Sequence, residues 1–149
     1  MIDLLINLGF SYKENTKDVL IKYYLNNEKY SIVIIDDETE ILNVLSRFLT
    51  RNPNFSVSTY SNPITALSSI SNSKVDLVLL DIMMPQMNGL EVLEKLKANN
   101  PEQKVIMMTA YSTLDKVLKS HKEGATNYVM KPFDSLQVLE KKILEVLKS

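Results

Sequence analysis

Two short apolar runs, each followed at once by aspartate, decide the fold of this chain. Residues 31–35 read SIVII and are followed by Asp36-Asp37-Glu38, while residues 75–80 read VDLVLL and are followed by Asp81. Continuous aliphatic runs of this length, bounded by polar residues, predict strands that are buried on both faces of a sheet. Carboxylates that directly follow such strands predict a polar site where the strands end.

Helical apolar spacing separates the strands along the rest of the chain. Because strands that alternate with helices need right-handed crossovers, we expect a parallel sheet with helices on both faces. The flavodoxin-like, doubly wound α/β fold with strand order 2-1-3-4-5 is the expected solution, and it places the ends of strands 1 and 3 side by side. We predict strands at 31–35, 55–60, 75–80, 104–108 and 127–130, and helices at 38–49, 63–70, 90–98, 113–121 and from a capping box at 134–137 onward.

The first 30 residues form a separate segment. Residues 2–8 and 16–26 have helical apolar spacing, and the second stretch carries Val19, Leu20, Tyr23 and Tyr24. Thirty residues cannot usually bury a core of their own. We therefore divide the chain into an N-terminal helical extension, 1–30, and an α/β domain, 31–149. The extension could cover a face of the domain, form a homodimer contact or be the remnant of a preceding domain.

Composition excludes several functions. The chain has 149 residues with 17 basic and 18 acidic side chains, no Cys and a single His. The balanced charge argues against a basic nucleic-acid-binding face, and the missing Cys excludes disulfides and thiolate metal ligands. No apolar run approaches the roughly 20 residues that span a bilayer, and no signal peptide is recognisable. We expect a cytoplasmic protein without membrane insertion and without direct contact to nucleic acid.

Three carboxylates should converge where strands 1 and 3 end. Asp36 and Asp37 follow the first strand and Asp81 follows the third. Two carboxylates about 5 Å apart repel by roughly 3 kcal/mol at an effective dielectric constant near 20, so the group needs a counter-charge. A hard divalent cation with oxygen ligands, Mg²⁺, fits this need. Lys131 after the fifth strand adds a second cation, and Thr109 follows the fourth.

Four short blocks in this order carry a family resemblance. From about Ser31 to the C-terminus the chain resembles the receiver domain of two-component response regulators, the family that includes the chemotaxis-type single-domain regulators. The blocks are IIDDE at 34–38, LDIMMPQMNG at 80–89, MTA at 108–110 and GATNYVMKPF at 124–133.

The resemblance implies a phosphorylation site with a metal ion. Asp81 would be the phosphoacceptor. Asp36, Asp37 and Asp81 would hold Mg²⁺, and the backbone carbonyl of Met83 would supply a further ligand.

The same resemblance implies a switch. Thr109 and Lys131 would contact the phosphoryl oxygens, and movement of Thr109 would couple to Tyr128 on the fifth strand. The Lys131–Pro132 peptide bond is expected to be cis.

The implied function is signalling, not metabolism. A sensor histidine kinase or a histidine phosphotransfer protein would phosphorylate Asp81. The change would be read by a downstream protein at the face formed by the helix at 113–121, the strand at 127–130 and the last helix. On this interpretation the protein is no enzyme beyond self-catalysed phosphotransfer and autodephosphorylation.

Four alternatives compete with this interpretation. A haloacid-dehalogenase-type phosphatase needs Asp-x-Asp after its first strand, but Asp36 is followed two residues later by Glu38. A flavodoxin needs a phosphate-binding loop there, which Asp-Asp-Glu would repel. Two further alternatives stay open: a receiver-like interaction module that is never phosphorylated, and a receiver fragment of a longer, for example DNA-binding, regulator.

Overall fold

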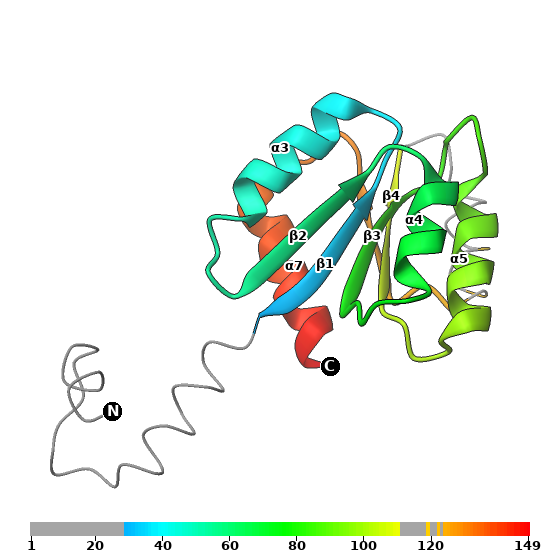
Figure 1. Cartoon of the computed structure of the whole chain (residues 1–149). Coiled ribbons are helices and arrows are strands. Elements are labelled where there is room, and N and C mark those ends of the chain that lie inside the picture. Colours follow the sequence, from blue (N-terminus) through cyan, green and yellow to red (C-terminus); the bar gives the residue numbers. More distant parts are fainter. Residues whose placement is uncertain (1–28, 111–118, 120–121, 123) are drawn as a thin grey trace, which may run out of the picture.

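Five parallel strands form one sheet in the order β2-β1-β3-β4-β5, which confirms the predicted flavodoxin-like fold (Figure 1). The computed structural model describes residues 29–110, 119, 122 and 124–149. The helices predicted at 2–8, 16–26 and 113–121 therefore lie outside the described residues, apart from Lys119. The elements are β1 (Tyr30–Ile35), α3 (Thr39–Leu49), β2 (Phe55–Tyr60), α4 (Pro63–Ile70), β3 (Leu77–Asp81), α5 (Gly89–Asn99), β4 (Val105–Thr109), β5 (Asn127–Met130) and α7 (Leu136–Lys148).

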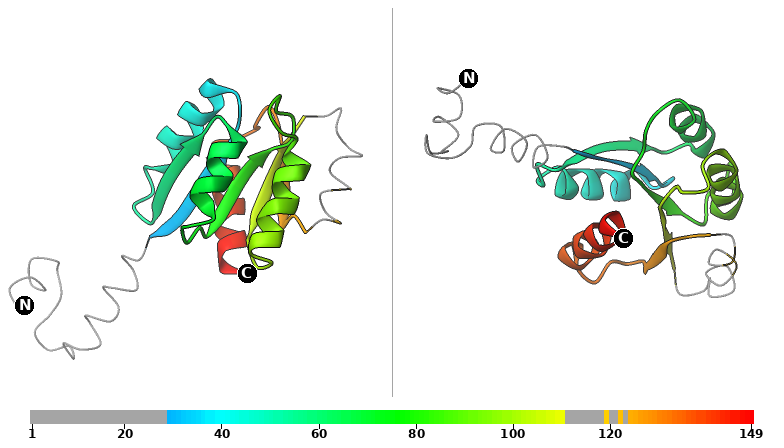
Figure 2. Two further views of the ribbon diagram at one scale, coloured as in Figure 1. Left: turned by 45° about the vertical axis from the view of Figure 1, so that its right-hand side comes forward. Right: turned by 90° about the horizontal axis from the view of Figure 1, so that it is seen from below.

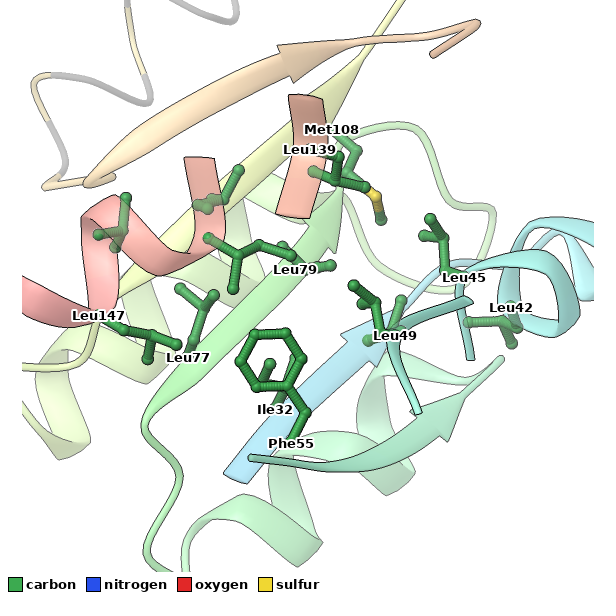
Figure 3. Close-up of a cluster of buried hydrophobic side chains, with 14 residues drawn as sticks. Ile32, Leu42, Leu45, Leu49, Phe55, Leu77, Leu79, Met108, Leu139 and Leu147 are labelled. Atoms are coloured by element: carbon green, nitrogen blue, oxygen red, sulfur yellow. The ribbon is translucent and has the colours of Figure 1, made fainter. Parts of the chain in front are cut away.

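Two apolar layers enclose the sheet. Helices α3 and α7 cover one face and α4 and α5 cover the other, as the view from below in Figure 2 shows. Alternate strand residues supply the two layers: Ile32 and Ile34 face α3 and α7, whereas Val33 and Ile35 face α4 and α5. Figure 3 shows the first layer, in which Phe55 and Leu77 lie among leucines of α3 and α7. The continuous apolar runs of the inner strands are therefore buried on both faces.

Side-chain caps fix the starts of two crossover helices. The Asn62 side chain accepts a hydrogen bond from the Ile64 amide at 2.9 Å, and Pro63 occupies the first helical position. The Asn88 side chain accepts one from the Leu90 amide at 2.8 Å. Each bond satisfies an amide that has no partner within the helix. The caps therefore set the helix starts close to the ends of the preceding strands.

The predicted helix start near the C-terminus is wrong in register. The N-cap of α7 is Ser135, whose hydroxyl accepts a hydrogen bond from the Val138 amide at 3.3 Å. The capping box predicted at 134–137 would have used Asp134. Instead the cap lies one residue later, and the Ser135 hydroxyl also donates to the Gln137 side chain.

Two inner strands begin and end later than predicted. We had predicted that Asp81 and Thr109 follow the third and fourth strands. In the structure Asp81 is the last residue of β3 and Thr109 is the last residue of β4. At the other end, Asp76 lies just before β3, and its side chain accepts a hydrogen bond from the Ser31 amide at 2.7 Å. The consequence is that Asp81 is held within the sheet ladder, opposite Met108.

Within the described ranges, no helix is long and apolar enough to cross a membrane.

Candidate functional site

The three predicted carboxylates do converge. Ile35 of β1 pairs with Leu80 of β3, so the aspartates that follow these two residues leave adjacent strands at the same level. One carboxylate oxygen from each of Asp36, Asp37 and Asp81 lies within 4.8 Å of the others. Asp36 and Asp81 are buried, with 0% and 5% of their surface exposed. The topology thus brings three acidic groups together, of which two are buried and Asp37 is half-buried.

Asp36 is held by bonds on all sides. Its amide donates to the Tyr60 carbonyl at 3.1 Å, which ties it to the end of β2. Its Oδ1 accepts a hydrogen bond from the Glu38 amide at 2.9 Å, and its Oδ2 lies 2.5 Å from Nζ of Lys131. A carboxylate with this many partners keeps one orientation, which a cation site requires.

Lys131 is the counter-charge of the site. Its Nζ lies 2.5 Å from Asp36 and 3.3 Å from Oδ1 of Asp81, with a longer contact of 3.5 Å to exposed Glu38. The Lys131–Pro132 peptide bond is cis, as predicted. The Lys131 amide also donates to the Thr109 carbonyl at 2.6 Å. Lys131 therefore faces the carboxylates from the β5 side and is anchored at the end of β4.

Burial and crowding change the acidity of the site. Burial raises the pKa of Asp81 from 3.8 to about 7, and the neighbouring charge of Asp36 adds to the rise. Burial likewise raises the pKa of Asp36, although Lys131 opposes the change. For Lys131, burial alone lowers the pKa, but the bond to Asp36 and the charge of Asp81 outweigh it, so the pKa lies above its usual value. One ammonium does not compensate three carboxylates.

Thr109 and Tyr128 project on the same side of the sheet. Tyr128 pairs with Met107, which lies two residues before Thr109 on β4, and residues two apart share a face of a strand. Thr109 is buried and its hydroxyl donates to the Ala110 carbonyl at 3.2 Å. The Tyr128 side chain is 41% exposed. The pair has the relative placement that the predicted switch needs, and the switch itself stays a prediction.

Gly89 belongs to the site, although we had predicted no role for it. A Cβ at this position would come within 2.1 Å of the Asp81 carbonyl oxygen and 2.7 Å of the Ile82 Cα. The Gly89 amide donates to the Ile82 carbonyl at 2.8 Å, so the loop closes back onto the end of β3. A glycine in the first turn of a helix, where it is a poor helix former, was the available signal.

The donor set fits a hard divalent cation. Three aspartates and one lysine give the pocket a formal charge of −2 when all are ionised, and carboxylate oxygens are the ligands that Mg²⁺ and Ca²⁺ prefer. Met83, whose carbonyl is the predicted further ligand, lies in the loop after β3, and its side chain is 54% exposed. Its role as a ligand stays a prediction.

The fold and the site define a doubly wound α/β domain with an acidic centre at its switch point. A family model described as response regulator receiver domain matches residues 32–143. Among curated proteins, the transcriptional regulatory protein ZraR of Klebsiella oxytoca is 36% identical over 116 residues, which are 76% of this chain and 26% of that protein. The DNA-binding transcriptional regulator NtrC of Klebsiella pneumoniae is 39% identical over 101 residues, 68% of this chain and 21% of that protein.

Solved structures agree with the family model. A CheY-like response regulator receiver domain protein from Methanospirillum hungatei JF-1 superposes with a TM-score of 0.77 at 35% identity, covering 81% of this chain and 95% of that one. The BeF3-activated DrrB receiver domain gives a TM-score of 0.73 at 30% identity, covering 81% and 99%. The chain belongs to the response regulator receiver domain family of two-component systems. It spans about a quarter of the length of the curated relatives named above.

Proposed function

We propose that Asp81 accepts a phosphoryl group from a phosphohistidine of a sensor histidine kinase or histidine phosphotransfer protein, with Mg²⁺ bound at the acidic pocket. The observation that carries the proposal is the buried Asp81 carboxylate, which shares a 4.8 Å cluster with Asp36 and Asp37 and has Lys131 at 3.3 Å. A carboxylate in this setting has a nucleophilic oxygen, a cation site beside it and a positive charge for the incoming group.

The proposed transfer needs only a few groups. An ionised Asp81 oxygen attacks phosphorus, the P–N bond of the donor breaks, and the imidazole leaves with the bonding electrons. Because phosphoryl transfer depends mainly on positioning and charge stabilisation, Lys131 would shift from the carboxylates toward the phosphoryl oxygens. A bound Mg²⁺ ion would neutralise charge on the pocket carboxylates and the phosphoryl oxygens. The protein would then be no enzyme beyond this self-catalysed transfer and the hydrolysis of the aspartyl phosphate, in which water takes up the phosphoryl group and the Asp81 carboxylate is regenerated.

The proposed response starts at Thr109. Its hydroxyl now donates to the Ala110 carbonyl and would turn to donate to a phosphoryl oxygen instead. Such a turn would free space on the face of the sheet that Tyr128 shares. We propose that a downstream protein reads the change at the surface that includes β5 and α7.

Two alternatives make different predictions. A receiver-like module that is never phosphorylated would bind its partner equally well with and without a phosphodonor. A receiver within a longer regulator is favoured by the curated relatives, of whose length this chain spans about a quarter. Because both are named as transcriptional regulators, the absence of direct nucleic-acid contact stays a prediction for the whole protein.

Phosphodonor labelling tests the proposal. The chain is incubated with acetyl phosphate or phosphoramidate and Mg²⁺, and the intact mass is measured over time. We expect one added phosphoryl group in the presence of Mg²⁺. No phosphoryl group should be added when EDTA replaces Mg²⁺, and none should be added to Asp81→Asn. The matched control is Asp134→Asn, which removes an exposed carboxylate outside the cluster. Labelling of Asp81→Asn at the wild-type rate would overturn the assignment.

A further inference from the structure

The loop between β3 and α5 contains a chemically labile dipeptide, Asn88–Gly89. The chain has three glycines, and Gly89 is the one that follows an asparagine. Glycine has no side chain to hinder its amide nitrogen, so this nitrogen can approach the side-chain carbonyl of the preceding asparagine more closely than that of any other residue. An asparagine in this position can lose its amide group without an enzyme.

The reaction is intramolecular and consumes only water. The Gly89 amide nitrogen loses its proton to solvent base and bonds to Cγ of Asn88. The bond between Cγ and Nδ2 breaks, and Nδ2 takes up a proton and leaves as ammonia. Water then opens the cyclic imide at either carbonyl, which leaves aspartate or isoaspartate at position 88. The net change is the exchange of one ammonia for one water.

The folded structure holds this dipeptide in an unreactive arrangement. The Gly89 amide donates to the Ile82 carbonyl at 2.8 Å, so the attacking nitrogen is engaged in a hydrogen bond. The Asn88 Oδ1 accepts a hydrogen bond from the Leu90 amide at 2.8 Å, which fixes the side chain over the helix start. The Asn88 backbone is extended, with ψ at 138°. Ring closure needs the Asn88 Cβ and the Gly89 nitrogen nearly eclipsed about the Cα–C bond, so ψ must first rotate.

Packing around the loop opposes that rotation. The Gly89 backbone packs so closely on β3 that a Cβ would come within 2.1 Å of the Asp81 carbonyl oxygen. The Val92 amide donates to the Asn88 carbonyl at 3.1 Å, and the Val92 side chain is fully buried in the layer under α4 and α5. Asn88 can therefore change its backbone conformation when the first turn of α5 leaves the end of β3. Local openings of this kind cost less free energy than global unfolding.

We propose that Asn88 is a deamidation site whose reaction proceeds from molecules in which the first turn of α5 has opened locally. The reaction needs neither a metal ion nor a phosphodonor, so the proposal stands or falls apart from the proposed function. An isoaspartate product lengthens the main chain by one atom directly before Gly89. Gly89 then cannot keep both its bond to Ile82 and its position against Asp81, and the loop stays displaced from β3.

A comparison of folded and unfolded protein tests the site. The full-length chain is incubated in mildly alkaline buffer with and without guanidinium chloride, and the peptide that contains Asn88 is followed by mass spectrometry. We expect aspartate and isoaspartate products in the denaturant, and conversion at least roughly tenfold slower in the folded protein. Asn88→Gln, whose longer side chain does not form the five-membered ring, is the control and should not react. Absence of both products in the denaturant, or equal rates in the two conditions, would overturn the proposal.

Two matched core variants test whether the opening is local. Val92→Ala and Val146→Ala each remove the same two methyl groups from a buried position, the first on α5 and the second on α7. Each variant is compared with the wild type under folding conditions, with circular dichroism as the check that it is folded. We expect Val92→Ala to speed deamidation of Asn88 several-fold and Val146→Ala to leave the rate near that of the wild type. Equal acceleration by both variants would show that the reaction requires global unfolding, which would overturn the local opening.

Discussion

The backbone of Gly89 lies against the carbonyl of Asp81 so closely that a Cβ would come within 2.1 Å of the oxygen. Because the nearest atoms belong to the backbone of β3, no side-chain rotation can relieve this contact. The backbone of the first turn of α5 therefore packs directly against the backbone of Asp81, the residue that we propose as the phosphoacceptor. A change at Gly89 reaches that residue directly.

Gly89→Ala should destabilise the domain, although alanine is normally the better helix former. We expect a loss of roughly 1–3 kcal/mol in the free energy of unfolding, the usual cost of overpacking, measured by urea denaturation. The phosphodonor labelling rate should fall as well, because the end of β3 must move. Glu91→Ala, at an exposed position in the same turn, should change neither quantity. An unchanged free energy of unfolding for Gly89→Ala would contradict the close contact.

The metal-free protein should lose stability as the pH rises from about 4 to 7. The pKa of Asp81 is raised from 3.8 to about 7 by burial and by Asp36, so the folded state binds this proton more tightly than the unfolded state. By linkage, the free energy of unfolding is highest below the pKa that Asp81 has in the unfolded state, and it declines until the pH passes the pKa in the folded state. The loss due to Asp81 has a ceiling of roughly 4 kcal/mol.

The other shifted groups do not reverse this trend. The pKa of Asp36 is raised too and acts in the same direction, while that of Lys131 lies above 10.5, outside this pH range. Thermal unfolding in EDTA at several pH values provides the measurement. A melting temperature that rises steadily from pH 4 to pH 7 would argue against a crowded, buried Asp81.

Asp81→Asn should stabilise the metal-free protein at pH 8 by about 2 kcal/mol, which is below that ceiling. The variant removes the buried charge but also a contact to Lys131, so the gain is smaller than the full pKa change implies. Near pH 4, where Asp81 is largely protonated, the gain should disappear. Urea denaturation in EDTA measures both values, and Asp134→Asn is the exposed control.

Added Mg²⁺ should reduce the advantage of Asp81→Asn. A ligand at 100 times its dissociation constant stabilises the folded state by about 2.7 kcal/mol, and the three-carboxylate site should bind the ion more tightly than the depleted one. An equal effect of Mg²⁺ on both proteins would place the ion elsewhere.

Lys131→Met should separate metal binding from phosphorylation. The ammonium lies 2.5 Å from Asp36 and 3.3 Å from Asp81, so it competes with a divalent cation for the same oxygens. Its removal should raise the affinity for Mg²⁺ at least several-fold, since a change of 1.4 kcal/mol already gives about tenfold. The labelling rate at saturating Mg²⁺ should nevertheless fall. Isothermal titration and intact mass measure the two effects, with Lys95→Met as the exposed control. Weaker Mg²⁺ binding by Lys131→Met would contradict the competition.

The sequence by itself determined the sheet and the composition of the acidic pocket. The apolar runs at 31–35 and 75–80 predicted buried strands, and the order of helices between them allowed one common topology. Given that topology, Asp36, Asp37 and Asp81 had to meet, because the ends of neighbouring parallel strands lie at the same edge. These inferences depend only on local periodicity and on a few chain-connection rules.

The tertiary structure alone decided which carboxylates Lys131 contacts and which backbone supports the pocket. Lys131 and Asp36 are 95 residues apart in the chain, and no local pattern reports that their side chains meet at 2.5 Å. The contact of Gly89 with Asp81 likewise depends on how the loop after β3 closes on the sheet. Strand periodicity fixes which face a residue takes, whereas contacts between side chains depend on the packing of all the elements together.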